Sequence, residues 1–179
     1  MQYRRARVAG GTYFFTVVTF QRRQILGVPE KIELLRSVIR KVKQGHPFTI
    51  DALVIMPDHI HTLWTLPDGD RDYPVRWNLI KREFSRQCRT ESATPSSPSR
   101  QSKGEREIWQ RRYWEHQIRD DRDFKQHMDY IHYNPVKHGY VMAPGDWLFS
   151  SFNRYAAKGF YSKDWGVQEI TFDENVGRE

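Results

Sequence analysis

The sequence contains a single cysteine, Cys88, and no apolar run near the ~18–20 residues that a transmembrane helix requires. One cysteine excludes internal disulfide bonds and any zinc site built from several thiolates. The basic residues at the start of the sequence are not followed by the apolar core of a signal peptide. These absences predict a protein of the reducing cytoplasm that has no membrane partner.

Basic residues outnumber acidic ones. The chain has 29 Lys and Arg against 22 Asp and Glu, which gives a formal net charge of +7. Aromatic residues make up 14% of the sequence, enough with the aliphatic residues for one core, and the length favours a single domain over residues 1–179. A positively charged, aromatic-rich domain favours a polyanionic partner such as a nucleic acid.

The charge is unevenly distributed along the chain. Residues 1–27 contain five arginines and no acidic residue, whereas residues 164–179 contain five acidic residues and one arginine. The acidic end could contact the basic start, imitate phosphate groups in a basic site, or extend into solvent as a tail.

Hydrophobic patterning predicts the element order β-α-β-β-α-β-α. Runs of β-branched and aromatic residues predict strands, and apolar residues at helical spacing predict helices. The Pro-Asp pair at residues 57–58 predicts a tight turn and hence an antiparallel hairpin. The strands are expected at residues 12–20, 48–56, 59–66 and 113–118, and the first two helices at 29–45 and 75–88.

The last predicted helix follows the fourth strand. Asp120 or Asp121 is expected to cap it, and it should end near Asn134 because Pro135 follows. The geometry at Asn134 then depends on whether the final helical turn holds. From about residue 139 the sequence has aromatic islands and little periodicity, which predicts a C-terminal wrap over the core.

This element order is typical of a ferredoxin-like (RRM-like) α+β fold, an antiparallel sheet with helices on one face. We expect the other face to be free for a nucleic-acid strand. Residues 89–107 are small, polar and rich in Ser and Pro, which predicts a mobile surface loop within the domain.

Two histidines, His59 and His61, are separated by one residue within a predicted strand. Side chains at positions i and i+2 of a strand point to the same face, so both imidazoles project together while Ile60 packs on the other side. Two neutral imidazoles in this arrangement can hold a divalent metal. Two histidines on a wet strand face fit the pattern as well, and a metal needs at least one further ligand.

The last predicted helix offers that ligand. Tyr130 and Asn134 are four residues apart and therefore lie on one helical face, roughly 5–6 Å apart at Cβ, with His127 on the same side. The Asn134 amide oxygen could complete a metal site with the two histidines, and Tyr130 would stand beside the metal. A core tyrosine and a helix-ending asparagine are the alternative interpretation.

These residue types suit attack on a DNA phosphodiester. A divalent cation on a non-bridging oxygen neutralises developing charge, and a tyrosine hydroxyl, with a pKa of about 10, becomes nucleophilic beside a cation or a base. The resulting phosphotyrosine conserves the bond energy, so a DNA hydroxyl can reverse the step without ATP. Phosphate coordination favours Mg²⁺ or Mn²⁺, although the histidines would also accept Zn²⁺.

Five segments spread over nearly the whole chain carry a family resemblance: residues 10–17, 56–67, 112–119, 130–139 and 147–152. Through them the sequence resembles the REP-associated tyrosine transposases, bacterial relatives of the single-strand insertion-sequence transposases. The resemblance implies the HUH single-tyrosine transposase fold, with His59, His61 and Asn134 as metal ligands and Tyr130 as the nucleophile. It also implies a 5′-phosphotyrosine intermediate and, as substrate, single-stranded DNA near repetitive extragenic palindromes that fold as hairpins. The Ser/Pro-rich segment 89–107 departs from the family pattern.

Basic residues near these segments are candidates for DNA contacts, and we expect the protein to act as a monomer because no long exposed apolar helix is evident. A module that grips hairpins without chemistry and a metal-dependent phosphodiesterase that uses water are the two alternative functions. A histidine-triad phosphodiesterase would need a third histidine at position 63, where the chain has Leu63. The candidate DNA-binding residues are Arg4, Arg5, Arg7, Lys81, Arg82, Arg86, Arg111, Arg112 and Lys137.

Overall fold

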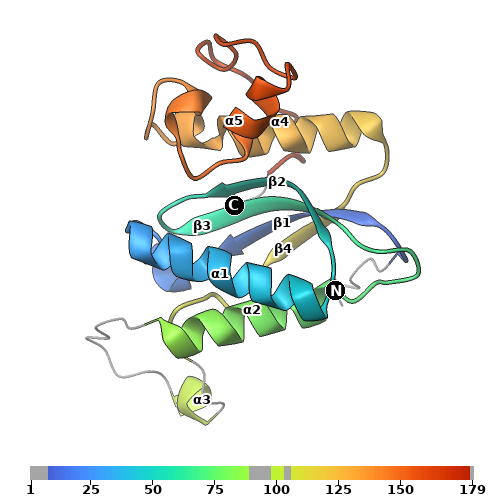
Figure 1. Cartoon of the computed structure of the whole chain (residues 1–179). Coiled ribbons are helices and arrows are strands. Elements are labelled where there is room, and N and C mark those ends of the chain that lie inside the picture. Colours follow the sequence, from blue (N-terminus) through green and yellow to red (C-terminus); the bar gives the residue numbers. More distant parts are fainter. Residues whose placement is uncertain (1–7, 89–97, 103–105, 178–179) are drawn as a thin grey trace.

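The computed structural model describes residues 8–88, 98–102 and 106–177, and its core is a four-stranded antiparallel sheet (Figure 1). The order of the strands is β2-β3-β1-β4, as expected for the ferredoxin-like plan. The strands are β1 (Thr12–Val18), β2 (Thr49–Ile55), β3 (His59–Thr65) and β4 (Trp114–Gln117).

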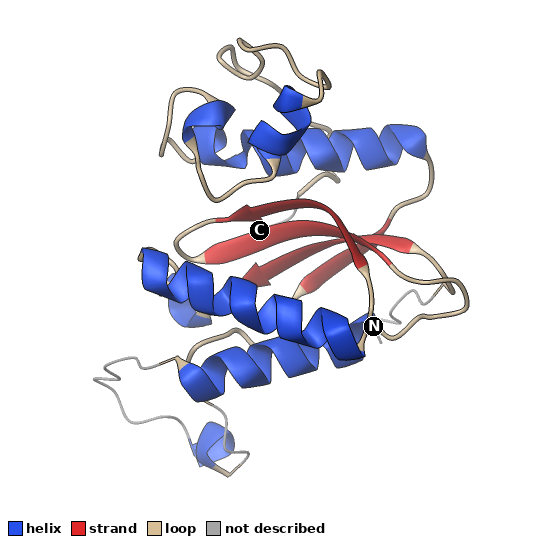
Figure 2. Ribbon diagram, in the orientation of Figure 1, coloured by secondary structure: helices blue, strands red, loops and turns tan. Residues whose placement is uncertain are grey.

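The two long helices α1 and α2 lie on one face of this sheet (Figure 2). The helix α1 (Pro29–Gly45) has the bounds expected from the sequence, and α2 (Tyr73–Gln87) begins two residues earlier than expected. Side chains of the central strands that point to this face form an aromatic core. Within it, the indole of Trp64 on β3 stacks on that of Trp77 on α2, with ring centroids 4.2 Å apart.

The opposite face of the sheet is covered by α4 (Asp121–Lys137), so the expectation of a free face for nucleic acid is wrong (Figure 1). Phe14 on β1 and Leu63 on β3 point to this face, and Met128 and Ile131 of α4 pack against them. The consecutive apolar residues of β1 are typical of a strand that is buried on both faces, and leaving Phe14 in water would forfeit its burial energy.

The helix α4 continues past Pro135 to Lys137, three residues beyond Asn134, near which the sequence predicted its end. Asp120 caps its start, since its carboxylate accepts a hydrogen bond from the backbone N–H of Asp123. Pro135 removes one helical hydrogen bond, but the next turn holds because the carbonyl of Asn134 accepts from the N–H of His138. Asn134 therefore keeps its helical position.

The remaining chain passes over α4 and the edge strand β2. It contains the short elements η2 (Pro144–Asp146) and α5 (Phe152–Ala157), and the N–H of Ile55 on β2 donates to the carbonyl of Phe149. The short turns η1 (Phe20–Arg22) and α3 (Pro98–Gln101) complete the described elements. Most of the predicted loop 89–107 lies outside the described residues. None of the described helices is long and apolar enough to cross a membrane.

Candidate active site

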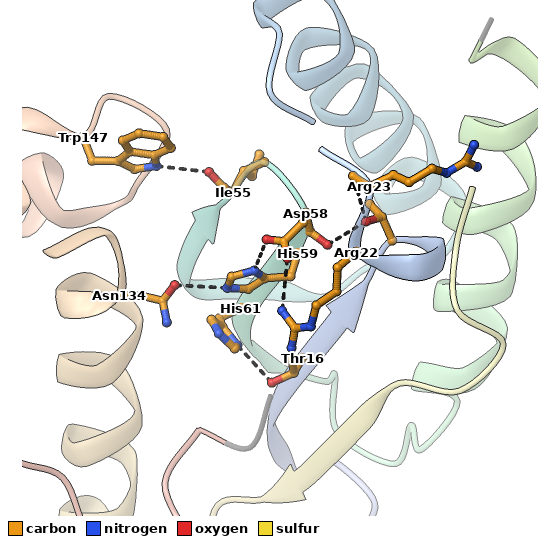
Figure 3. Close-up of polar contacts among 10 residues, drawn as sticks. Thr16, Arg22, Arg23, Ile55, Asp58, His59, His61, Asn134 and Trp147 are labelled. Carbon is orange, nitrogen blue, oxygen red and sulfur yellow. Dashed lines mark hydrogen bonds and ion pairs between the residues drawn. The ribbon is translucent and has the colours of Figure 1, made fainter. Parts of the chain in front are cut away.

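The two histidines of β3 lie side by side beneath α4 (Figure 3). His59 and His61 are both buried, and their ring centroids are 4.7 Å apart. Ile60 between them packs into the core on the α1 and α2 side. The alternation predicted from the sequence is therefore what separates the histidine pair from the apolar core.

His59 is held at both ring nitrogens. Its Nδ1 lies 2.6 Å from Oδ1 of Asp58, and its Nε2 lies 3.1 Å from Oδ1 of Asn134. The His59 tautomer that donates its Nδ1–H to the carboxylate presents an unprotonated Nε2 to the amide oxygen. Two acceptor atoms at that distance need a proton or a cation between them, and this donor set therefore fits a metal ion.

Arg22 connects this arrangement to η1. Its guanidinium donates to Oδ2 of Asp58 at 3.1 Å, and its backbone, like that of Gln21, is left-handed with a φ of 52°. Burial alone would raise the pKa of the Asp58 carboxyl, but hydrogen bonds and charge from His59 and Arg22 outweigh it and lower the pKa. Asp58 is thus an ionised carboxylate that orients the His59 ring.

His61 is oriented by β1. The hydroxyl of Thr16 lies 2.9 Å from Nδ1 of His61, and this pairing makes Nε2 the ring atom that a metal would use (Figure 3). Both histidines therefore have Nδ1 engaged by a neighbouring side chain. Such outer contacts fix the orientation of metal-binding imidazoles.

Tyr130 lies directly beside this pair. Its ring centroid is 5.3 Å from that of His61, and only 2% of the residue is exposed. The Tyr130 hydroxyl accepts a hydrogen bond from Nζ of Lys137 at 2.8 Å and donates to the carbonyl of Gly177 at 2.9 Å. The structure thus brings Tyr130, the two histidines and Asn134 together at one point under α4.

The C-terminal segment covers Tyr130. Phe172 meets the Tyr130 ring edge-on with centroids 5.3 Å apart, Val176 is buried, and a side chain at Gly177 would overlap the tyrosine ring. The segment makes these contacts with apolar side chains and its backbone, while Asp173 accepts from Gln126 at 2.8 Å. The described acidic side chains of this end are exposed, and the contacts with Tyr130 come from Phe172 and the backbone of Gly177, so no carboxylate takes the place of a phosphate at the tyrosine.

Among the described residues, the basic side chains predicted to bind DNA do not form one surface. Of the described ones, only Lys137 lies at Tyr130. The residues Lys81, Arg82 and Arg86 belong to α2, on the other side of the sheet, where Arg86 pairs with Glu83. The remaining members of the set are Arg111 and Arg112, in the segment before β4, and Arg4, Arg5 and Arg7, which lie outside the described residues.

Three features of the site were not anticipated from the sequence. Asp58 reads as a turn residue, although its position next to His59 could have signalled a partner for the imidazole. Thr16 pairs with His61 across β1 and β3, which only the strand register reveals. The contact of Gly177 with Tyr130 joins segments that are far apart in the sequence, so no local sequence pattern predicts it.

Comparison with known proteins identifies the family. Residues 7–134 match the family model described as "Transposase IS200 like". Over 171 residues the chain is 44% identical to the REP-associated tyrosine transposase of Escherichia coli (strain K12), covering 96% of this chain and 94% of that relative. The chain belongs to the REP-associated tyrosine transposases.

The fold supports this membership. A solved structure of a REP-associated tyrosine transposase bound to a REP hairpin matches with a TM-score of 0.76 and 41% identity, covering 99% of both chains. The chain is therefore a transposase by family, with the α+β fold of the HUH group. The region matched by the family model ends at Asn134, so it includes His59, His61 and Tyr130.

Proposed function

We propose that this transposase cuts and rejoins single-stranded DNA beside REP hairpins, with Tyr130 as the nucleophile. The observation that carries the proposal is the convergence of Tyr130, His61 and the His59–Asn134 pair beneath α4. A tyrosine hydroxyl next to a metal-type donor set matches the requirements of phosphodiester attack. A core tyrosine would need none of these neighbours.

His59, His61 and Asn134 would hold a divalent metal ion. When bound, that ion supplies a positive charge that neutralises the phosphate oxygens as charge develops on them. Mg²⁺ or Mn²⁺ suits the phosphate substrate, because both prefer hard oxygen ligands and leave positions open for them.

Tyr130 supplies the covalent step. Its phenolic oxygen bonds to phosphorus as the bond between phosphorus and the 3′ oxygen breaks, which leaves a 5′-phosphotyrosine and a free 3′-hydroxyl. The phenol proton passes to water, and the departing 3′ oxygen takes a proton from water. Lys137, which donates to the phenolic oxygen, favours the negative charge on that oxygen as nucleophile and again as leaving group when a 3′-hydroxyl rejoins the strand.

The substrate follows from the family and the charge of the chain. A relative of 41% identity was solved bound to a REP hairpin, and the net charge of +7 favours a polyanion. We extend hairpin binding to this chain, which we expect to act as a monomer. Each chain offers one tyrosine at the site, so two cuts require two chains or two rounds.

A covalent trapping experiment tests the proposal. The protein is incubated with Mg²⁺ or Mn²⁺ and a single-stranded hairpin with flanking sequence, and the mixture is denatured and separated by electrophoresis. We expect a protein–DNA adduct that is lost in Tyr130→Phe and retained in Tyr133→Phe, a control one helical turn away on α4.

The same experiment separates the alternative functions. Cleavage that survives in Tyr130→Phe would indicate a phosphodiesterase that uses water. Hairpin binding without cleavage in the unmodified protein would indicate a binding module. Either result would overturn the proposal.

A further inference from the structure

A second group of metal-binding residues lies at the start of α4, apart from the site described above. His116 on β4 and Asp123 and His127 on α4 each offer a ligand atom, and the three atoms lie within 4.8 Å of one another. We propose that His116, Asp123 and His127 form a second divalent-metal site, of the class that binds zinc. The inference does not depend on the strand-transfer chemistry.

The carboxylate of Asp123 is the centre of the group. Its Oδ2 lies 2.9 Å from Nε2 of His116, and its Oδ1 lies 3.1 Å from Nδ1 of His127. The two imidazole rings stack with centroids 4.6 Å apart and an interplanar angle of 17°. Two imidazole nitrogens and a carboxylate oxygen are the ligands of many three-residue zinc sites that keep a position for water.

The fold fixes these three side chains before any ion binds. Asp123 and His127 are four residues apart on α4 and so share a helical face. The Asp120 cap holds the first turn in place, and β4 is paired with β1, which positions His116. A site assembled on a helix and a strand needs little rearrangement to accept an ion.

Burial and neighbouring charges favour the protonation states that metal ligands need. Asp123 and His127 are buried, at 4% and 1% exposure. Burial lowers the pKa of His127, so its imidazole is neutral near pH 7. Burial would raise the pKa of Asp123, but hydrogen bonds from Arg119 and His116 outweigh it, so the group is an ionised carboxylate.

Hydrogen bonds engage all three side chains of the group. His116 shares a proton with the Asp123 carboxylate, and Nδ1 of His127 lies 2.9 Å from the backbone carbonyl oxygen of Asp123. Arg119 donates to Oδ2 of Asp123 at 2.9 Å. The Arg119 side chain is 71% exposed and can move into solvent, and a metal would displace the shared protons. The hydrogen-bonded form also leaves Nε2 of His127 buried with no hydrogen-bond partner among the described residues, so this network is not fully satisfied.

The group is separate from the histidine pair of β3. The Phe14 ring lies between them, with its centroid 4.8 Å from that of His127 and 5.4 Å from that of His61. An ion at the second site would link β4 to the first turns of α4, three residues before Tyr130. Its direct effect would be to clamp the helix that carries the proposed nucleophile.

Zinc titration of the full-length protein tests the inference. In the double variant His59→Ala/His61→Ala we expect one equivalent of Zn²⁺ to bind, with Co²⁺ giving the visible absorption of tetrahedral coordination. Adding His127→Ala should remove this binding, and adding His116→Gln should weaken it about tenfold or more. Zn²⁺ should also raise the melting temperature of the double variant.

The controls separate loss of a ligand from loss of the fold. His116 is partly exposed, so His116→Gln should keep the circular dichroism spectrum of the parent, and His46→Ala, at an exposed histidine after α1, should leave zinc affinity within about twofold. A folded double variant that binds no zinc would overturn the inference. Zinc affinity unchanged by both His116→Gln and His127→Ala would overturn it equally.

Discussion

The two faces of the sheet differ in the side chains that they bury and in the role that we propose for them. Toward α1 and α2, residues such as Phe15, Ile60 and Trp64 form a continuous apolar and aromatic core. Toward α4, the apolar packing around Phe14 and Leu63 is interrupted by buried histidines. Since neighbouring residues of one strand point to opposite faces, adjacent residues of β3 lie in the apolar core and in the proposed active site.

The strongest test of this division uses two adjacent residues of β3. His61→Ala should reduce cleavage by roughly 10³-fold or more, because metal stabilisation of the transition state contributes several kcal/mol. Ile60→Val should leave the cleavage rate unchanged and cost about 0.5–1.5 kcal/mol of unfolding free energy. Single-turnover cleavage assays and urea denaturation measure the two effects.

Hairpin affinity provides the control for this pair. His61→Ala should bind a REP hairpin nearly as well as the unmodified protein, because the imidazole is buried and acts through the metal. If binding collapses together with cleavage, the histidines are structural and the two faces do not differ in role.

A substitution that disturbs the orientation of His59, on the same face of the sheet, should have a smaller effect. Asp58→Asn keeps the size of the side chain but removes the charge that holds Nδ1 of His59. We expect Mn²⁺ affinity to fall about 10–100-fold, the usual loss for an outer partner of a metal ligand. Calorimetric Mn²⁺ titration measures it, with Asp68→Asn on the exposed loop after β3 as the control. Equal affinities in the two variants would argue against the role of Asp58.

A buried histidine on the outer side of α4 should make the folding stability depend on pH. His132 accepts from the Ser151 hydroxyl at 2.8 Å, and Tyr161 engages its other nitrogen. Burial, helped by the charge of Arg154, lowers the pKa of His132 to about 3. The unfolded chain therefore binds a proton below about pH 6.5 that the folded chain excludes, and stability should fall by about 2 kcal/mol between about pH 6.5 and about pH 5.

Denaturation at both pH values, in the unmodified protein and in His132→Gln, isolates this group. The variant is less stable at neutral pH, but its stability should change less across the interval. An identical pH slope in the two proteins would show that His132 is not the group responsible.

The C-terminal segment gives the smallest expected change. Removing residues 172–179 frees the Tyr130 hydroxyl from Gly177 and uncovers its ring, so adduct formation should accelerate by about tenfold, which corresponds to about 1.4 kcal/mol. Val176→Asp should act in the same direction, whereas Asn175→Ala, at an exposed position of the same segment, should not. A slower rate in the shortened chain would indicate that the segment assists the reaction.

The sequence predicted the α1 and α2 face closely and the α4 face less well. Period-two and helical patterns depend on neighbours within one segment, and they located His59 and His61 on β3 and Tyr130 on a helix. The hydrophobicity of Phe14 was visible too, but only the three-dimensional arrangement shows that α4 covers it. The register that pairs Thr16 with His61 is likewise set by the whole sheet.

Charge was the least informative pattern. The α2 arginines lie on the other side of the sheet from Tyr130, and the acidic end contacts Tyr130 through Phe172 and the backbone of Gly177 instead of through a carboxylate. A basic side chain can lie anywhere on a protein surface, so its position in the sequence does not show which face of the protein it occupies. Lys137, a predicted DNA contact, donates to the Tyr130 hydroxyl, because the last turn of α4 holds beyond Pro135.

The most direct measurement is the chemical identification of the protein–DNA bond. After reaction with a REP hairpin, nuclease digestion and proteolysis leave a nucleotide remnant on one peptide, which tandem mass spectrometry can locate. We expect a remnant joined through a 5′-phosphate to the oxygen of Tyr130. A remnant on any other residue, or cleavage with no remnant in the unmodified protein, would contradict it.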